Sequence, residues 1–141
     1  MRFSAGVYLY KQTAAFLERI LAWQKRGLPS QFAPLSRADN RLIGYCGFHQ
    51  EVDGTNEIGY RLHPTYWNKG LATEAAQAVR DHAFRDLNLS RVISLIHPEN
   101  GASRRVAEKI RMQFERKTVF KGFPALVFAI SCERWLTSRA A

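Results

Sequence analysis

The stretch that decides the fold spans residues 66–75 and reads Tyr66-Trp67-Asn68-Lys69-Gly70-Leu71-Ala72-Thr73-Glu74-Ala75. It predicts the end of a strand, a glycine turn and the start of a helix. The first N–H groups of a helix lack intrahelical acceptors, and the helix dipole places partial positive charge there. No acidic residue precedes Glu74 in the stretch. We therefore predict that a phosphate group binds main-chain N–H groups here, with Gly70 allowing close approach.

The spacing around Gly70 excludes two common phosphate-binding loops. A nucleoside-triphosphate loop reads G-x-x-x-x-G-K-[ST], and a dinucleotide loop reads G-x-G-x-x-G after a strand. Here Gly70 is followed by Leu71 and Ala72, so neither pattern is present. A single glycine between a strand and a helix is more often an ordinary turn, and the surrounding sequence must decide.

Length and composition set the class of protein. The chain has 141 residues, of which 46% are hydrophobic, which suits one domain with a core rather than two. We expect a single domain over residues 1–141. No apolar run approaches the ~20 residues of a bilayer-spanning helix, and the N-terminal residues lack the apolar segment of a signal peptide. We expect a soluble, cytoplasmic protein without a membrane partner.

Cysteine and histidine residues give no sign of a metal site. Cys46 and Cys132 stand in apolar, strand-like sequence, without a C-x-x-C pair or a histidine at ligand spacing. The four histidines are scattered along the chain. We therefore predict no bound metal and expect both cysteines to be small core residues in a reducing compartment.

The formal net charge of +9 suggests nucleic-acid binding as one possible function, because phosphate contacts dominate affinity for nucleic acids. Lys and Arg residues occur along the whole chain, however, without a basic tail or an aromatic-interleaved RNA motif. The charge favours solvated helix faces and attraction for a small anion. A basic nucleic-acid-binding module ranks last among the functions considered.

Hydrophobic periodicity predicts the secondary structure. Helices are expected over residues 13–26, 72–87 and 103–110, and strands over residues 41–49, 57–62, 91–97, 114–120 and 125–132, with residues 32–36 in the place of a further strand. The Asp53-Gly54 dipeptide and the segment 121–124 predict hairpins. A strand–helix–strand segment among antiparallel neighbours indicates a mixed, mostly antiparallel sheet with helices on both faces, an α/β (α+β) fold.

Two motifs in order identify a family. They are Glu57-Ile58-Gly59-Tyr60-Arg61-Leu62-His63-Pro64-x-Tyr66-Trp67-x-Lys69-Gly70-Leu71-Ala72-Thr73-Glu74-Ala75, and then His97-Pro98-Glu99-Asn100 with Ser103-x-x-Val106-Ala107-Glu108-Lys109. Over residues 3–135 the chain resembles the GNAT acyltransferases, specifically the branch similar to ribosomal-protein N-acetyltransferases. The resemblance implies acetyl-CoA as cosubstrate and a primary amine, on a protein N-terminus or a small molecule, as acceptor. The amine would attack the thioester directly.

The resemblance also implies how acetyl-CoA is held. In such enzymes the strand at 57–62 parts from the strand at 91–97, and pantetheine lies in the opening. Leu62 would contact pantetheine through its main chain and Asn100 through its side-chain amide. The pyrophosphate would bind the N–H groups of the loop, with added charge from Lys69; the loop residues are Asn68, Lys69, Gly70, Leu71, Ala72 and Thr73. For Asn100, a helix cap is the alternative role.

The resemblance suggests a general base. An ammonium group has no lone pair, so the acceptor must lose a proton before or during attack. Glu57 is the candidate, because glutamates at a similar position serve as base in some members of the superfamily. The alternative is a solvent-facing or salt-bridged strand glutamate. Glu51 and His63 are weaker candidates.

The general acid is less well defined. Many relatives carry a tyrosine shortly after the second helix, where this chain has Arg111, Met112 and Gln113. Ser103 is the candidate that remains, since its hydroxyl could protonate the departing thiolate. N-terminal capping of the helix is its alternative role.

Three departures from the family pattern motivate a rival reading. Relatives carry a further strand and helix before the start of this chain, so we expect a truncated sheet edge, which leaves a homodimer open. Pro34 lacks the N–H of a central strand residue, which places residues 32–36 at an exposed edge. Arg111 replaces a glycine at the expected left-handed helix exit, at a cost of about 1 kcal/mol. The rival is a truncated or degenerate acyltransferase that binds CoA weakly or not at all.

Overall fold

The structure is a computed structural model that describes residues 10–140. Its helices are α1 (Tyr10–Lys25), α2 (Leu71–Arg85), α3 (Gly101–Lys109) and α4 (Cys132–Ala140), with a short 3-10 turn η1 (Pro64–Tyr66). Its strands are β1 (Gln31–Phe32), β2 (Gly44–Gln50), β3 (Asn56–Leu62), β4 (Arg91–Ile96), β5 (Gln113–Phe120) and β6 (Phe123–Ser131). The expectation that the chain begins inside a domain rests on residues 1–3, which lie outside the described range.

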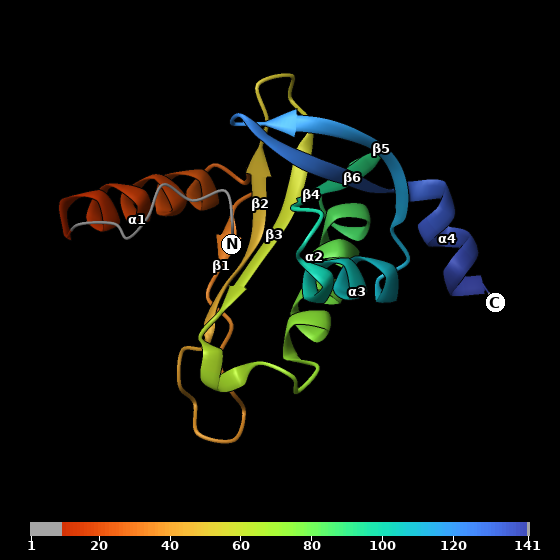
Figure 1. Ribbon diagram of the computed structural model, residues 1–141. Coiled ribbons are helices and arrows are strands. Elements are labelled where there is room, and N and C mark those ends of the chain that lie inside the picture. The colour runs from red at the N-terminus through yellow and green to blue at the C-terminus, as the bar shows by residue number, and fades with distance from the viewer. Residues whose placement is uncertain (1–9, 141) are drawn as a thin grey trace.

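The six strands form one sheet in the order β1-β2-β3-β4-β6-β5 (Figure 1). Four neighbouring pairs are antiparallel, and β3 with β4 is the parallel pair. Gly54 turns the β2–β3 hairpin with φ of 87°. Lys121 and Gly122, with φ of 50° and 79°, turn the β5–β6 hairpin. The prediction of a mixed, mostly antiparallel sheet is confirmed.

Two helices cover one face of the sheet, and α1, none of whose residues is buried, contacts the other face. On one face α2 and α3 lie side by side (Figure 1), over a core that includes Cys46, Phe48, Ile58, Val79, Ala83, Ile96, Ala107 and Phe128. On the other face α1 places Phe16 with its ring centroid 6.0 Å from that of Tyr45. Because β2 residues alternate in direction, Tyr45 points away from the side to which Cys46 points. The predicted α/β fold with helices on both faces is therefore confirmed.

Helix α4 was not predicted, and the strand expected over residues 125–132 ends one residue early, at Ser131. Cys132 opens α4 and is half-buried, so it is not the core strand residue that was expected. Trp135 is 5% exposed and packs against Phe84 of α2, with ring centroids 5.4 Å apart. The sequence of α4 has only a weak apolar periodicity. Packing of the Trp135 side chain against α2 therefore stabilises this helix.

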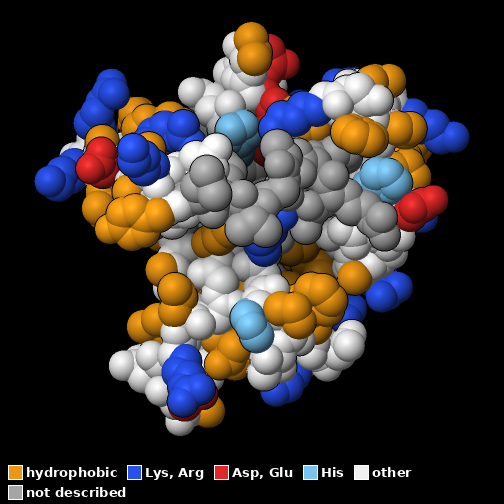
Figure 2. Space-filling view, turned by 60° about the vertical axis from the view of Figure 1, so that its left-hand side comes forward, with side chains coloured by type: hydrophobic (Ala, Val, Ile, Leu, Met, Phe, Trp, Pro, Cys, Tyr) orange, Lys and Arg blue, Asp and Glu red, His pale blue; other side chains and the backbone are white. Residues whose placement is uncertain are grey.

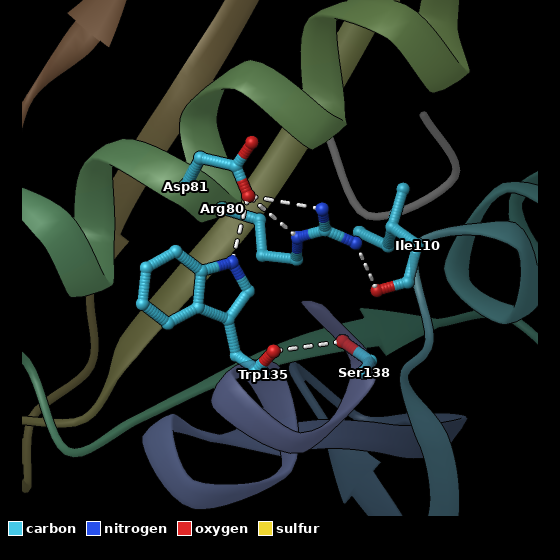
Figure 3. Close-up of polar contacts among 5 residues, drawn as sticks. All are labelled: Arg80, Asp81, Ile110, Trp135 and Ser138. Carbon is cyan, nitrogen blue, oxygen red and sulfur yellow. Dashed lines mark hydrogen bonds and ion pairs between the residues drawn. The ribbon is translucent and has the colours of Figure 1, made fainter. Parts of the chain in front are cut away.

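A buried polar cluster, here called the latch, joins α2, the end of α3 and α4 (Figure 3). Arg80 is 8% exposed and donates from Nη1 to the Ile110 carbonyl oxygen at 2.8 Å. Asp81 Oδ1 accepts from Nε and Nη2 of Arg80, at 3.2 and 2.9 Å, and from Trp135 Nε1 at 2.8 Å. Burial raises the pKa of Asp81, but the hydrogen bonds from Trp135 and Arg80 outweigh it and hold this pKa below its ordinary value.

The sheet edge at β1 is shorter than expected. Only Gln31 and Phe32 pair with β2, because Pro34 has no N–H to continue the ladder. The Pro34 carbonyl oxygen instead accepts from Ile43 N at 3.1 Å. In the sheet formed by residues 10–140 the predicted edge position is right, whereas the strand boundary at residues 32–36 is wrong.

The exit of α3 has the predicted backbone. Arg111 follows the helix with φ of 71°, which is the left-handed region that favours glycine. Arg134 of α4 donates from Nε to the Arg111 carbonyl oxygen at 3.0 Å, so arginines from two helices cap two carbonyls at this exit. Within residues 10–140, no helix has the length and apolar character needed to cross a membrane.

Candidate functional site

The parallel strands β3 and β4 part from each other soon after they meet. Their register contains one pair, Glu57 with Ile93, and a further link runs from Ser94 Oγ to the Ile58 carbonyl oxygen at 2.8 Å. Beyond this point β3 continues in register with β2 as far as Leu62, and β4 continues with β6. The sheet therefore opens toward the C-terminal ends of the two strands.

A cavity of about 430 Å³ lies at this opening. It is bounded by the end of β3, the turn after η1, the first turn of α2, and α3; its lining residues include Tyr60, Arg61, Leu62, Trp67, Asn68, Gly70, Leu71, Ala72, Thr73, Asn100, Ser103, Arg105 and Lys109. Eight of the ten predicted site residues are in this lining. The two that are not are Lys69, whose Nζ lies 5.8 Å from the ring centroid of Tyr66, and Glu57, considered below.

The start of α2 has the backbone of an anion site. Gly70 is the N-cap with φ of 76° and ψ of 4°, and no side chain among the described residues caps this helix. The N–H groups of Leu71, Ala72 and Thr73 have no intrahelical acceptor by the geometry of a helix, and these residues face the cavity. The helix dipole adds partial positive charge at the same place. This end of the cavity is suited to a phosphate group.

Tyr60 closes the cavity between β3 and α3. Its hydroxyl donates a 2.8 Å hydrogen bond to the Ser103 carbonyl oxygen, and burial raises the pKa of this phenol. Sequence reasoning missed Tyr60. The strand period of two could have found it, because Tyr60 points to the same side of β3 as Leu62.

The first turn of α3 assigns different roles to Asn100 and Ser103. Asn100 is the N-cap of α3, and its Oδ1 accepts from Ser103 N at 3.1 Å. The capping role of Asn100 is thus present, and its amide NH₂ is the group left to face the cavity. Ser103 is the third residue of α3, so its alternative role as the cap is wrong.

Leu62 and Trp67 are linked across the cavity mouth. Trp67 Nε1 donates to the Leu62 carbonyl oxygen at 2.8 Å. One lone pair of that carbonyl is thereby used within the protein, and one remains for a ligand. Trp67 is 58% exposed, and its place in the cavity lining was not predicted.

Glu57 lies at the root of the opening and outside the cavity lining. Side chains along a strand point alternately to its two faces, and Ile58 and Tyr60 point toward α2. The side chain of Glu57 therefore points to the opposite face of the sheet. Its Oε1 accepts from Leu95 N of β4 at 3.3 Å. Burial, a hydrogen bond with Glu51 and the charge of Glu51 raise the pKa of Glu57 to about 8. Glu57 is therefore a half-buried acid with another carboxyl group among its neighbours, rather than a solvent-facing strand glutamate.

Other groups offer little chemistry. The part of the chain that the structure describes holds no cluster of three or more His, Cys, Asp or Glu side chains that could bind a metal ion. Burial raises the pKa of Cys46 to about 12, which keeps this thiol protonated. On the face that Figure 2 shows, Lys and Arg side chains stand at several separate places with hydrophobic side chains between them.

Comparison with known proteins gives a consistent result. The sequence pattern of the acetyltransferase (GNAT) domain matches residues 1–113. The uncharacterized N-acetyltransferase YnaD of Bacillus subtilis (strain 168) is 35% identical over 137 residues, which cover 92% of this chain and 78% of YnaD.

Solved structures show the same architecture. The acetyltransferase (GNAT family) from Bacillus anthracis superposes with a TM-score of 0.76 at 32% identity, over 91% of this chain and 78% of that one. RimL, a ribosomal protein acetyltransferase solved in complex with coenzyme A, superposes with a TM-score of 0.77 at 19% identity, over 91% of this chain and 76% of that one. At 19% identity this second likeness concerns the fold alone.

Proposed function

This chain belongs to the GNAT family of acetyltransferases, and from that premise we propose that it transfers an acetyl group from acetyl-CoA to a primary amine. The observation that carries the proposal is the 430 Å³ cavity at the parted strands, with an uncapped helix N-terminus in its wall. A cavity with a phosphate-binding end and a narrow opening between strands suits a long molecule that carries a pyrophosphate.

The residues present fit such a ligand. The pyrophosphate would bind the N–H groups of the segment 68–73, because Gly70 adds no side chain there and no side chain within residues 10–140 caps the helix. Lys69, Arg105 and Lys109 would add positive charge. The pantetheine arm would meet the remaining lone pair of the Leu62 carbonyl and the amide NH₂ of Asn100.

Bound acetyl-CoA would supply a thioester, and the protein would supply a base and an acid. Glu57 takes a proton from the ammonium group of the acceptor, and the freed nitrogen lone pair attacks the carbonyl carbon. The C–S bond breaks as the C–N bond forms, and the sulfur leaves as a thiolate. Ser103, which lines the cavity, is the candidate that protonates this thiolate, and the second proton that the nitrogen loses on becoming an amide restores the Ser103 hydroxyl.

Isothermal calorimetry with acetyl-CoA tests the proposal first. Saturable binding is expected, whereas no saturable heat at about millimolar ligand would favour the rival reading of a degenerate acyltransferase. An amine panel with labelled acetyl-CoA then tests transfer. The panel includes a peptide with a free N-terminus, spermidine, a free amino acid and an aminoglycoside. Transfer to none of them, with binding intact, would contradict catalysis on these amine classes.

A matched pair of variants tests the role of Glu57. Glu57→Gln is expected to lower turnover by about 10²-fold or more while acetyl-CoA affinity stays within about threefold. Glu18→Gln removes one carboxylate from the exposed face of α1 and should change neither quantity. Normal turnover in Glu57→Gln would remove Glu57 from the mechanism.

A further inference from the structure

The carboxyl groups of Glu51 and Glu57 lie against each other on the face of the sheet away from α2. Glu51 directly follows β2, and the hairpin bond from Glu51 N to the Thr55 carbonyl oxygen, at 2.8 Å, holds it beside the start of β3. Because Glu51 pairs with Thr55, two residues before Glu57, the side chains of Glu51 and Glu57 lie on the same face of the hairpin, where Glu51 acts on Glu57 and raises its pKa. Glu51 Oε1 is buried, and within the described residues no protein donor satisfies it.

A hydrogen bond between two carboxyl groups requires a proton on one of them, because ionised carboxylates have acceptors only. Two adjacent ionised carboxylates would also repel each other at short distance. A shared proton resolves both problems, since it satisfies the buried Glu51 oxygen and removes one charge.

The surroundings of the pair determine where its remaining charge resides. From β4, the Leu95 N–H donates to Glu57 Oε1, and it favours the ionised form of Glu57. From β2, His49 stands opposite Glu57 in the register. From the β5–β6 turn, the charge of Lys121 acts on Glu57.

Two further charged or titratable groups are near. Arg91 lies two residues before Ile93 on the same face of β4, and it is ion-paired with Glu115 of β5. Tyr60 points to the other face of the sheet and stays neutral, because burial raises its pKa. None of these groups replaces Glu51 as the carboxyl neighbour of Glu57.

We propose that Glu51 is a positioning residue for proton transfer at Glu57, because the two carboxyl groups share a single proton across their contact. The inference rests on the proposed function. In the transfer step the doubly ionised pair takes one proton from the acceptor ammonium group, whose nitrogen lone pair is thereby freed. The pair then holds the shared proton, which passes to solvent before the next turnover.

This arrangement makes Glu57 a stronger base than an isolated glutamate. A base is most effective when its pKa lies near the operating pH, and an alkyl ammonium group needs a base that is not too weak. Burial of Glu57 and, in addition, the neighbouring Glu51 carboxyl group destabilise the ionised form of Glu57, so Glu57 binds the acceptor proton more tightly. Turnover in the native protein should therefore rise with pH through about 8, where the raised pKa of Glu57 lies.

Glu51→Gln tests the inference, because it keeps the size of the side chain and removes its charge. The acid limb of the pH profile of kcat/KM should move down by about 1–3 pH units, and the plateau rate should fall because the base is weaker. The acceptor is the amine that gives the highest rate in the panel above. Glu51→Asp, which retracts the carboxyl group by one methylene, should give a smaller shift. The control Glu18→Gln should leave the profile in place.

NMR titration of the glutamate side-chain carboxyl carbons needs no turnover and separates this inference from the proposed function. One carbon should titrate near pH 8 in the native protein, vanish in Glu57→Gln, and shift down in Glu51→Gln. Transfer to amines with a Glu57 titration that Glu51→Gln leaves in place would overturn the inference and keep the proposed function. The expected titrations without transfer to any amine would uphold the shared proton and overturn the proposed function.

Discussion

The hydroxyl group of Tyr60 lies 2.8 Å from the carbonyl oxygen of Ser103 and donates a hydrogen bond to it. Tyr60 comes from β3 and Ser103 from α3, so the bond joins two walls of the cavity. Tyr60 is partly buried, and the strands on which these walls stand have already parted. Where β3 and β4 no longer share backbone hydrogen bonds, the Tyr60 side chain therefore links β3 to α3.

Tyr60→Phe should therefore lower the free energy of unfolding by about 1 kcal/mol, the usual net value of a hydrogen bond of this kind. Urea denaturation measures the change. Tyr10→Phe is the matched control, because Tyr10 is 90% exposed and loss of its hydroxyl should cost less than about 0.5 kcal/mol. Equal effects in the two variants would show that the bond to Ser103 does not stabilise the fold.

Gly70→Ala should weaken acetyl-CoA binding by about tenfold or more, because a methyl group at this N-cap would enter the space where main-chain N–H groups meet the pyrophosphate. Gly54→Ala is the control. Both glycines have positive φ, at 76° and 87°, and at both sites an added Cβ meets no atom within 4 Å. The two variants should lose similar stability, about 1–2 kcal/mol. Calorimetry should show normal acetyl-CoA affinity for Gly54→Ala, and an equal loss in both would contradict the assignment of the loop.

Local sequence was enough to predict the sheet and the anion-binding turn, whereas the opening between the two strands was implied by the family resemblance. The glycine at 70, the Asp53-Gly54 hairpin and the apolar run from residue 91 each have a short-range signature. The predicted loop residues other than Lys69 line one cavity with Asn100, where a strand, a turn and two helix N-termini meet. The roles of these residues toward acetyl-CoA stay predictions.

The features that escaped prediction depend on contacts distant in sequence. Helix α4 is stabilised by the contact of Trp135 with the Phe84 ring and by its hydrogen bond to Asp81. The apolar periodicity of α4 alone is too weak to predict a helix. The contact between Glu51 and Glu57 depends on the register of a hairpin, since a shift by one residue would turn the two carboxyl groups to opposite faces. Pro34 predicted an edge strand. The residue at which β1 ends depends instead on which of its backbone groups form hydrogen bonds with β2.

Arg111→Gly should stabilise the protein by about 0.5–1 kcal/mol. The left-handed backbone of Arg111, with φ of 71°, costs a side-chain-bearing residue about 1–2 kcal/mol, and the greater freedom of glycine in the unfolded chain offsets part of the gain. The bond from Arg134 to the Arg111 carbonyl persists because it uses main chain.

Asn88→Gly is the control for this change. Asn88 also has positive φ, at 55°, but asparagine tolerates this region well, so the gain should be absent or smaller. Thermal and urea unfolding measure both variants. A loss of stability in Arg111→Gly would show that the arginine side chain contributes more than its backbone costs.

Asp81→Asn should destabilise the protein near neutral pH and have little effect in acid. Asp81 accepts three hydrogen bonds within the latch, and they hold its pKa below the ordinary 3.8. A carboxyl group whose pKa is lower in the folded state stabilises that state above its unfolded pKa, and this contribution is lost as pH falls through the folded pKa. The difference in unfolding free energy between the native protein and Asp81→Asn should therefore be constant above about pH 5 and shrink below 3.8.

Urea denaturation at several pH values, with Asp39→Asn as the control, measures this dependence. Asp39 is exposed, so its variant should follow the native curve within about 0.5 kcal/mol at every pH. Asp81→Asn should instead converge on the native curve at the acid end, because protonated Asp81 is a poor acceptor for the charged Arg80. A constant difference down to about pH 2.5 would show that the latch stabilises the fold through packing of Trp135 and not through the charge of Asp81.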